Sequence, residues 1–263
     1  MANIDYSRAR IISDPAPATI VRWLVAGWRD FCLNRTYSLL YGGGLVLFGW
    51  ALILLLFRNG LAWALLPMLA GGVLVGPVVT VGLYRVASGK TRVAAKGQIT
   101  LVGIILMVFA MAWIRAATIL FAIVYGLKPF EGFVATLSLL LSTSSGWVLL
   151  VSGTLVGGLF AALGFAVSAF SLPMLVERDI DGFSAMGLSF NATTQNFRLT
   201  VLWGMTIAAL TALGILTGFL GLVIIFPLLG YATWHAYDDL FRQGGGAKPQ
   251  PGSEHVRIVG EEV

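Results

Sequence analysis

Residues 99–125 read ITLVGIILMVFAMAWIRAATILFAIVY, and this stretch decides the fold class. It contains a single charged side chain, Arg115. As a helix it would be about 40 Å long, because each residue adds about 1.5 Å. About 20 apolar residues are enough to cross a bilayer. The stretch therefore predicts a membrane-spanning helix.

The composition of the whole chain has the same character. Of the 263 residues, 58% are hydrophobic and 11% are charged, and the mean hydropathy is +0.88. A soluble domain has about 45–50% apolar and about 25% charged residues. These values argue against a soluble enzyme or a disordered chain. The single cysteine, Cys32, excludes an intrachain disulfide and a cysteine-based metal cluster.

Further apolar segments predict an all-α membrane protein with a bundle of six transmembrane helices. The expected spans are residues 37–57, 61–86, 99–125, 147–172, 199–216 and 219–237. The apolar core within residues 127–146 is too short to cross, so it predicts an outer-face or re-entrant helix. Two amphipathic stretches, residues 20–35 and 183–197, predict helices on the cytoplasmic face.

These segments form a single membrane domain, residues 20–240. The polar residues 1–19 before it are expected to be a flexible cytoplasmic tail, and residues 241–263 after it a disordered one. Residues 1–19 contain no apolar core of the kind that a cleavable signal peptide has. The first span is therefore expected to direct insertion.

The basic residues orient the chain. Of the 17 Lys and Arg residues, fourteen lie in segments placed inside, whereas Arg58 and Lys128 lie outside. This asymmetry predicts six spans with both termini in the cytoplasm. The net charge of +5 indicates membrane topology rather than nucleic-acid binding, and Arg22 and Arg29 are expected to meet anionic headgroups of the lipid bilayer.

Arg115 is the most informative residue of the spans. An arginine inside a bilayer costs about 2.5–3.5 kcal/mol on insertion scales, so it should face the bundle or a wet cavity, or extend toward the surface. Glu131 is the sole acidic residue of the outside segments and is the best candidate partner. Two alternatives stay open, an Arg115–Glu131 or anion-binding site and a structural arginine that binds backbone carbonyls.

Glycine, alanine and proline mark further candidate positions. Gly153, Gly157 and Ala161 are spaced by four residues, which predicts a helix-packing row within the monomer, at a homodimer interface or along a pore. Gly76, Pro77 and Pro227 predict helix bends, because proline removes a backbone hydrogen bond. Bent helices also form substrate sites in some transporters.

The polar residues near the last span give little sign of catalysis. His235 lies in the sequence TWHAYDDL without a second ligand close to it, so an interfacial anchor is expected rather than a haem or metal ligand. Asp30 and Glu177 are expected to be solvated and to pair with neighbouring arginines. We find no catalytic or nucleotide-binding motif in a credible context, and therefore expect no enzyme activity and no cofactor.

A weak internal similarity links the two ends of the domain. Asn34 precedes the pair Tyr41-Gly42 by the same spacing as Asn196 precedes Trp203-Gly204. Either the first two spans are duplicated in the last two, or the match arises by chance from a restricted set of residue types.

Several motifs together resemble a known family. They are GWRD (27–30), SLLYG (38–42), GPVVTVGLY (76–84), SLPMLVERD (171–179) and PLLGYATWHAY (227–237). The resemblance is to uncharacterised proteobacterial polytopic integral membrane proteins catalogued as a domain of unknown function, and it covers about residues 20–240. It implies several spans and a location in the bacterial inner membrane. Family members often carry histidine where this chain has Tyr231, which weakens any two-histidine site here.

Two functions are compatible with these observations. The leading one is a non-enzymatic scaffold, accessory or assembly factor, with another membrane protein or a second copy of the chain as its partner. The alternative is a transporter or channel for a small solute or lipid. A polar cavity that reaches Arg115 would favour transport, whereas an apolar groove between helices would favour the accessory role.

Overall fold

The computed structural model describes residues 9–61, 65–126 and 133–241. Its fold is all-helical, with 84% helix, and no strand occurs in these three ranges. The helices are α1 (Ala16–Leu33), α2 (Arg35–Arg58), α3 (Leu65–Val79), α4 (Val81–Ala87), α5 (Lys96–Tyr125), α6 (Phe133–Ser142), α7 (Ser144–Ser168), α8 (Ser171–Glu177), α9 (Gly182–Gln195), α10 (Phe197–Leu216) and α11 (Leu222–Phe241).

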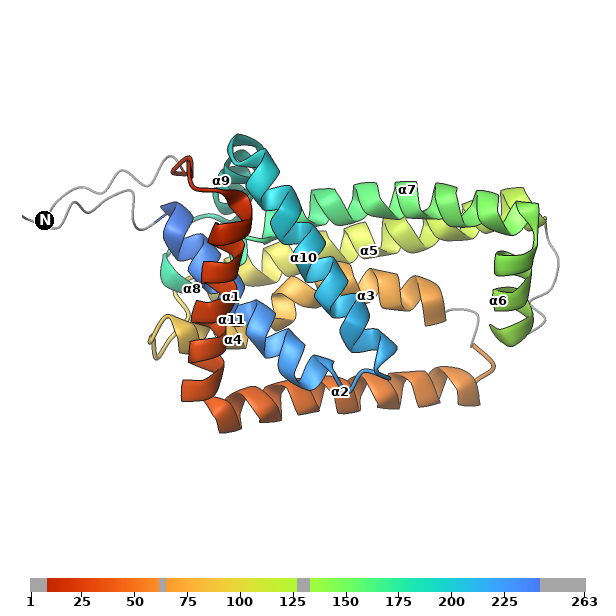
Figure 1. Cartoon of the computed structure of the whole chain (residues 1–263), viewed down its shortest axis with the longest axis horizontal. Coiled ribbons are helices and arrows are strands. Elements are labelled where there is room, and N and C mark those ends of the chain that lie inside the picture. The colour runs from red at the N-terminus through yellow and green to blue at the C-terminus, as the bar shows by residue number, and fades with distance from the viewer. Residues whose placement is uncertain (1–8, 62–64, 127–132, 242–263) are drawn as a thin grey trace, which may run out of the picture.

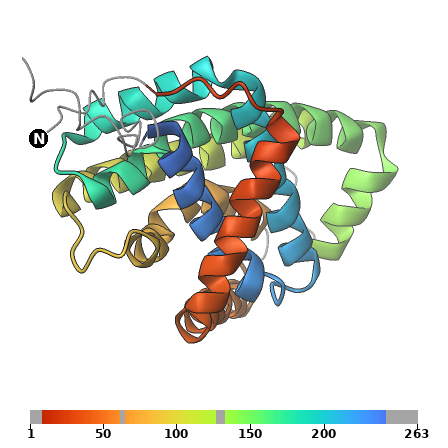
Figure 2. The ribbon, with the colours of Figure 1, turned by 60° about the vertical axis from the view of Figure 1, so that its left-hand side comes forward.

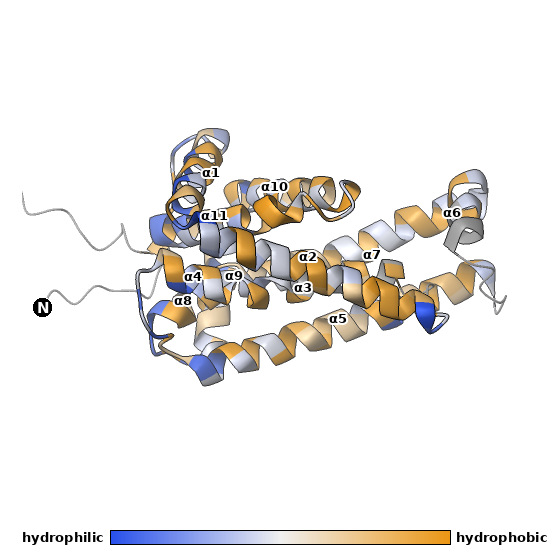
Figure 3. Cartoon of the chain, turned by 90° about the horizontal axis from the view of Figure 1, so that it is seen from below, coloured by the Kyte–Doolittle hydropathy of each residue, from blue (hydrophilic) through white to orange (hydrophobic). Residues whose placement is uncertain are grey.

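The long helices share one direction. In Figure 1, α2, α5 and α7 run along the longest axis of the molecule, α1 lies across one end, and α6 lies across the other. We call the end with α1, α4, α8 and α9 the basic end. Hydrophilic residues gather there, whereas the long helices are mostly hydrophobic (Figure 3).

Four described helices are long and apolar enough to cross a membrane. They are α2, α5, α7 together with α8, and α10. The expected span 61–86 divides at Thr80 into α3 and α4, and residues 62–64 lie outside the described ranges. The expected span 219–237 corresponds to α11, which begins three residues later and extends to Phe241. The six-span count therefore stays a prediction for these two segments.

Both expected amphipathic segments are helical and lie at the basic end. α1 crosses the bundle at a steep angle to α2 (Figures 1 and 2). One asparagine joins each amphipathic helix to the next long helix, with φ −113° and ψ 38° at Asn34 and φ −109° and ψ 38° at Asn196. A hydroxyl four residues later, on Ser38 or Thr200, donates to the carbonyl of each asparagine. The two joints thus have the same local structure, in agreement with the sequence similarity around them.

The apolar core lies at the basic end rather than in the middle of the bundle. Trp23 of α1, Phe170 before α8, Trp203 of α10 and Leu240 of α11 are almost completely buried there. The rings of Trp23 and Trp203 meet edge to face at 5.6 Å. The long helices instead leave large apolar side chains exposed, as expected for surfaces that face lipid.

The first described residues are held against this core, which differs from the flexible tail expected for residues 1–19. The Arg10 amide donates to the Leu240 carbonyl over 2.9 Å. The Ile12 amide donates to Asn196 Oδ1, and Asn196 Nδ2 donates to the Arg10 carbonyl. The segment before α1 is thus fixed by hydrogen bonds to α11 and to the α9–α10 joint.

Candidate functional site

A row of polar side chains joins α11 to α1 and to the start of α2. Tyr231, His235 and Asp239 are spaced by four residues and so lie on one face of α11. Tyr231 Oη lies 3.1 Å from Ser38 Oγ, and His235 Nε2 lies 2.8 Å from Asp30 Oδ2. We call Tyr231, His235, Asp239 and their partners the α1–α11 polar row.

Asp239 has two donors at the end of this row. Trp23 Nε1 donates to Asp239 Oδ2 over 3.1 Å, and Arg22 donates to the same oxygen over 2.9 Å. The Asp239 side chain is 9% exposed, whereas that of Arg22 is 54% exposed and also contacts Asp14. A carboxylate this deeply placed needs such donors, because burial without them is costly.

The two helices of the row approach closely between its hydrogen bonds. A Cβ atom added at Gly27 of α1 would lie 2.7 Å from the Ala232 amide nitrogen of α11. Glycine therefore permits backbone contact between the helices, and the flanking polar pairs fix their register. The sequence predicts His235 as an interfacial anchor and Asp30 as a partner of arginine, whereas in the structure the His235 ring is hydrogen-bonded to Asp30.

The outer side of α1 combines arginine with apolar side chains. A shallow groove there is lined by the basic Arg22 and Arg29, by the hydrogen-bonded pair Asp30 and His235, and by apolar side chains that include Val21, Val25 and Leu33. Guanidinium groups bind phosphates, and the apolar side chains suit the boundary between headgroups and acyl chains. The arrangement has the chemistry expected for contact with a lipid surface.

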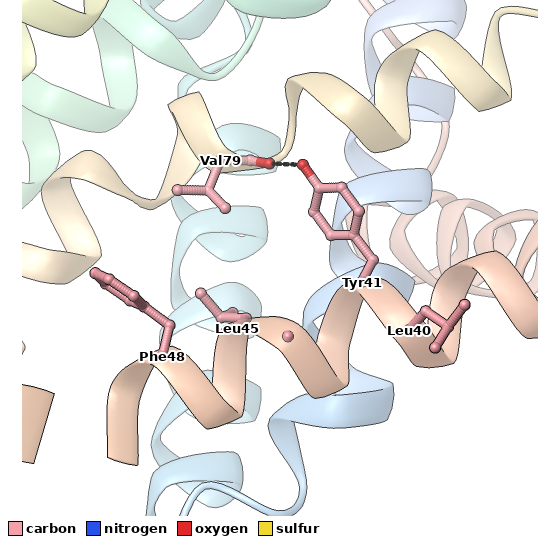
Figure 4. A pocket seen from close by; sticks show the side chains of 6 residues that line it. Leu40, Tyr41, Leu45, Phe48 and Val79 are labelled. Carbon is pink, nitrogen blue, oxygen red and sulfur yellow. Dashed lines mark hydrogen bonds between the residues drawn. The ribbon is translucent and has the colours of Figure 1, made fainter. Parts of the chain in front are cut away.

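A second groove lies between α2 and α3. It is apolar and open, and Figure 4 shows Tyr41, Leu45 and Phe48 of α2 facing Val79 at the end of α3. Leu40 and Gly44 complete its lining. The groove exists because these two helices, although adjacent in sequence, pack elsewhere: α2 packs against α11, and α3 packs against α5.

The helix interruption after Pro77 forms one wall of this groove. The Tyr41 hydroxyl donates to the Val79 carbonyl, and the Thr80 hydroxyl donates to the Pro77 carbonyl over 2.6 Å. Tyr37 donates to the Gly82 carbonyl over 3.4 Å. Side chains therefore satisfy carbonyl groups around the α3–α4 junction, where the regular helix is interrupted. At Gly76, one residue before Pro77, an added Cβ atom would meet no atom within 4 Å.

Pro227, the other expected bend position, lies inside α11. A proline removes the hydrogen bond to the carbonyl four residues earlier, which here is that of Val223. This carbonyl faces Gly42, where an added Cβ atom would lie 2.2 Å from the Val223 oxygen. At Gly42 the backbones of α2 and α11 therefore come into contact, beside the carbonyl that Pro227 leaves without its helix hydrogen bond.

Arg115 lies on the exposed side of α5. Met111 and Ile119, one turn before and one turn after it, are 62% and 59% exposed. Arg115 makes no hydrogen bond or ion pair with any other residue that the structure describes. It therefore does not face the described part of the bundle, which was one of the sequence expectations. Glu131 lies outside the described residues, so an Arg115–Glu131 pair stays a prediction.

The expected small-residue row on α7 has two sides. An added Cβ atom at Gly157 would lie 2.9 Å from the ring of Trp113 on α5, and one at Gly153 would lie 3.8 Å from Leu120. These two glycines thus face α5, whereas Ala161 is exposed. Close packing of α5 on α7 explains the glycines.

Glu177 at the end of α8 has the arginine partner that the sequence suggested, since Arg178 Nε lies 3.6 Å from Glu177 Oε2, although its side chain is only 14% exposed. The acidic residues near α8 also have partners that the sequence did not suggest. The Tyr237 hydroxyl donates to Glu177 Oε2 over 2.5 Å, and Lys90 donates to the Glu177 carbonyl. The Asp181 side chain accepts from the Ser184 amide over 2.8 Å, and so begins α9. This hydrogen bond lowers the pKa of Asp181. Among the described residues, no group of three or more His, Cys, Asp or Glu side chains could hold a metal ion.

The chain was also compared with known proteins. No curated protein and no solved structure matches it significantly. A family model matches from the start of α3 to the end of α8, which includes the α3–α4 junction, Arg115 and Glu177. Over this region the expected resemblance to uncharacterised integral membrane proteins is confirmed. Residues 65–177 match the family described as predicted integral membrane protein (DUF2189), and with its apolar helices this makes the chain an integral membrane protein.

Proposed function

We propose that this chain is a non-enzymatic accessory or scaffold protein that binds another membrane protein within the bilayer. The observation that carries the proposal is the apolar groove between α2 and α3, which is open on its outer side. Gly44 lies in this groove, and an added Cβ atom there would meet no atom within 4 Å. Small residues allow helices to approach closely in membranes, so the groove suits an apolar helix of a partner.

The position of Arg115 supports the same proposal. A transporter that used Arg115 to bind a solute would place it toward a polar cavity inside the bundle. Arg115 is instead exposed beside Met111 and Ile119. The exposed position favours lateral contact with a neighbour over solute binding by the described bundle.

A second candidate function, transport of a small solute or lipid, has one observation in its favour. The α3–α4 junction is an interrupted helix beside Pro77, and interrupted helices form substrate sites in several transporter folds. The carbonyl groups of Pro77, Val79 and Gly82 already accept side-chain hydrogen bonds. This makes the junction a stable structural feature, and transport is therefore the less favoured proposal.

We further propose that the basic end faces the cytoplasm of a bacterial cell and that the protein lies in the inner membrane. The concentration of Lys and Arg in the segments of this end supports that orientation. α1 lies across the bundle there, with Arg22 and Arg29 on its outer groove. In this orientation both arginines meet anionic headgroups.

Site-specific photo-crosslinking in native membranes tests the accessory function. A photoreactive amino acid at Phe48 would lie in the groove, and one at Leu155, on the exposed side of α7, serves as the control. We expect a protein adduct of defined mass from Phe48 and only lipid adducts from Leu155. A chain that purifies alone and gives only lipid adducts at Phe48 would contradict the accessory role.

A further inference from the structure

We infer that the exposed face of α5 around Arg115 docks a transmembrane helix of another protein that carries a carboxylate at the same depth. The inference rests on the proposed accessory function and specifies a second contact surface and its chemistry. The face is a continuous apolar stripe, with Arg115 as its only charged residue. Its other members are Ile104, Val108, Met111, Ile119 and Ile123, which are between 56% and 75% exposed.

The depth of Arg115 makes its exposure informative. Tyr125 ends α5 ten residues later, so Arg115 lies about 15 Å along the axis from that end. At a similar level, Trp113 packs against Gly157 of α7, itself well inside that helix. Along the helix axis, Arg115 therefore lies at the level of the apolar middle of the bundle, although its side chain is on the outside. Charged residues at such depth pair with other polar groups, because lipid chains offer none.

Charge complementarity identifies the occupant. A guanidinium group in an apolar medium binds a carboxylate with two parallel hydrogen bonds. A second copy of this chain is a poor source, because none of its 12 Asp and Glu residues lies in the apolar segments expected to cross the membrane. The rest of the face, which includes Met111 and Ile119, is apolar and can pack against the apolar side chains of a partner helix. A transmembrane helix of another protein that carries one carboxylate would therefore pair with Arg115 and pack against the stripe.

Association with a synthetic helix tests this chemistry directly. The full chain, labelled with a fluorophore at Cys32, which is exposed and is the single cysteine, is reconstituted in phosphatidylcholine vesicles. The probe is a Leu-Ala transmembrane peptide with one central Glu, and the control peptide has Gln there. We expect energy transfer to show about three- to tenfold tighter association of the Glu peptide.

Variants assign that preference to Arg115. The Arg115→Leu substitution should abolish it, Arg115→Lys should retain most of it, and Leu155→Ile on the exposed side of α7 should leave it unchanged. Equal association of the two peptides with the wild-type chain would overturn the inference. If Glu131→Gln then creates a preference that the wild-type chain lacks, Arg115 is held by Glu131 within the chain, which also overturns it.

Crosslinking in native membranes tests the natural partner. A photoreactive residue at Ile119 should give a protein adduct that Arg115→Leu removes and Arg115→Lys retains. The identified partner should have a membrane carboxylate whose exchange with Arg115, by a reciprocal charge swap, restores the adduct. If the partner complex persists unchanged in Arg115→Leu, the inference fails and the accessory function stands. If no protein adduct forms and the chain purifies alone, both fail.

Discussion

The substitution Gly42→Ala should separate α2 from α11. The added Cβ atom would lie 2.2 Å from the Val223 oxygen and 2.8 Å from its carbonyl carbon and Cα. Ordinary van der Waals contact between a Cβ atom and a neighbour begins at 3.4 Å. The two helices would therefore have to move apart by about 1.2 Å at this point, the difference between 3.4 Å and 2.2 Å. The neighbour is backbone and cannot rotate away as a flexible side chain could.

The cost follows from packing and from helix propensity together. Overpacking costs about 1–3 kcal/mol, and we expect the upper end because backbone meets backbone. Alanine also stabilises a helix by about 1 kcal/mol relative to glycine. The substitution Gly43→Ala at the adjacent position gains the same helix propensity without a clash, because an added Cβ atom there would meet no atom within 4 Å. The difference between Gly42→Ala and Gly43→Ala is therefore about 3 kcal/mol and reports the contact alone.

Thermal unfolding of the two purified variants in the same detergent measures this difference. A gap of about 3 kcal/mol corresponds to about 6–12 °C in Tm for a chain of this size. Tryptophan fluorescence is a suitable signal, because Trp23, Trp203 and Trp234 are buried at the basic end. Equal Tm values for Gly42→Ala and Gly43→Ala would show that α2 and α11 do not approach as described, and would refute the reasoning.

Further predictions concern the α1–α11 polar row and the start of α9. Asp239→Ala should lower the free energy of unfolding by about 1–3 kcal/mol, measured by thermal unfolding, because it leaves the buried Trp23 N–H group unpaired. Asp30→Ala and His235→Ala should show a coupling of about 0.5–1.5 kcal/mol in a double-mutant cycle, and additive effects would contradict their hydrogen bond. The lowered pKa of Asp181 means that its capping contribution is present above the unfolded-state pKa and is lost as the pH falls through the folded-state pKa. Asp181→Ala should remove this acid-dependent step from unfolding curves recorded across that pH range.

That residues 20–35 and 183–197 are helical could be predicted from the sequence because the signals are local, whereas their place on the cytoplasmic face stays a prediction. Residues 20–35 and 183–197 were expected, and the structure has helices at Ala16–Leu33 and Gly182–Gln195. Helical periodicity and the polar residues that interrupt it depend only on neighbours along the chain, so these helices can be predicted without knowing the tertiary packing. The same reasoning applies to the four helices that are long and apolar enough to cross a membrane.

The partners of the polar residues could not be predicted in the same way. His235 and Asp30 are separated by 205 positions, and nothing local indicates that α1 lies against α11. One signal was nevertheless present: Tyr231, His235 and Asp239 are spaced by four residues and therefore lie on one face of the expected helix. A polar row of this kind inside a membrane protein indicates a facing helix with complementary groups. The facing helix is the amphipathic segment with Arg22, Trp23 and Asp30.

The exposure of Arg115 has a different meaning in a membrane protein than in a soluble one. In water an exposed arginine needs no partner, and burial would be the feature to explain. In a bilayer the relation is reversed, because the exposed face is the one without hydrogen-bonding groups. The sequence therefore predicted that Arg115 faces the bundle or a wet cavity or extends toward the surface, with Glu131 as the candidate partner, and Glu131 lies outside the described residues. Since the described bundle leaves Arg115 on the outside, its counter-charge must come from Glu131, from lipid headgroups or from another protein. The apolar stripe on both sides of Arg115 suits lipid as well as a partner helix, so the charge of Arg115 at this depth is the observation that favours a docked acidic helix.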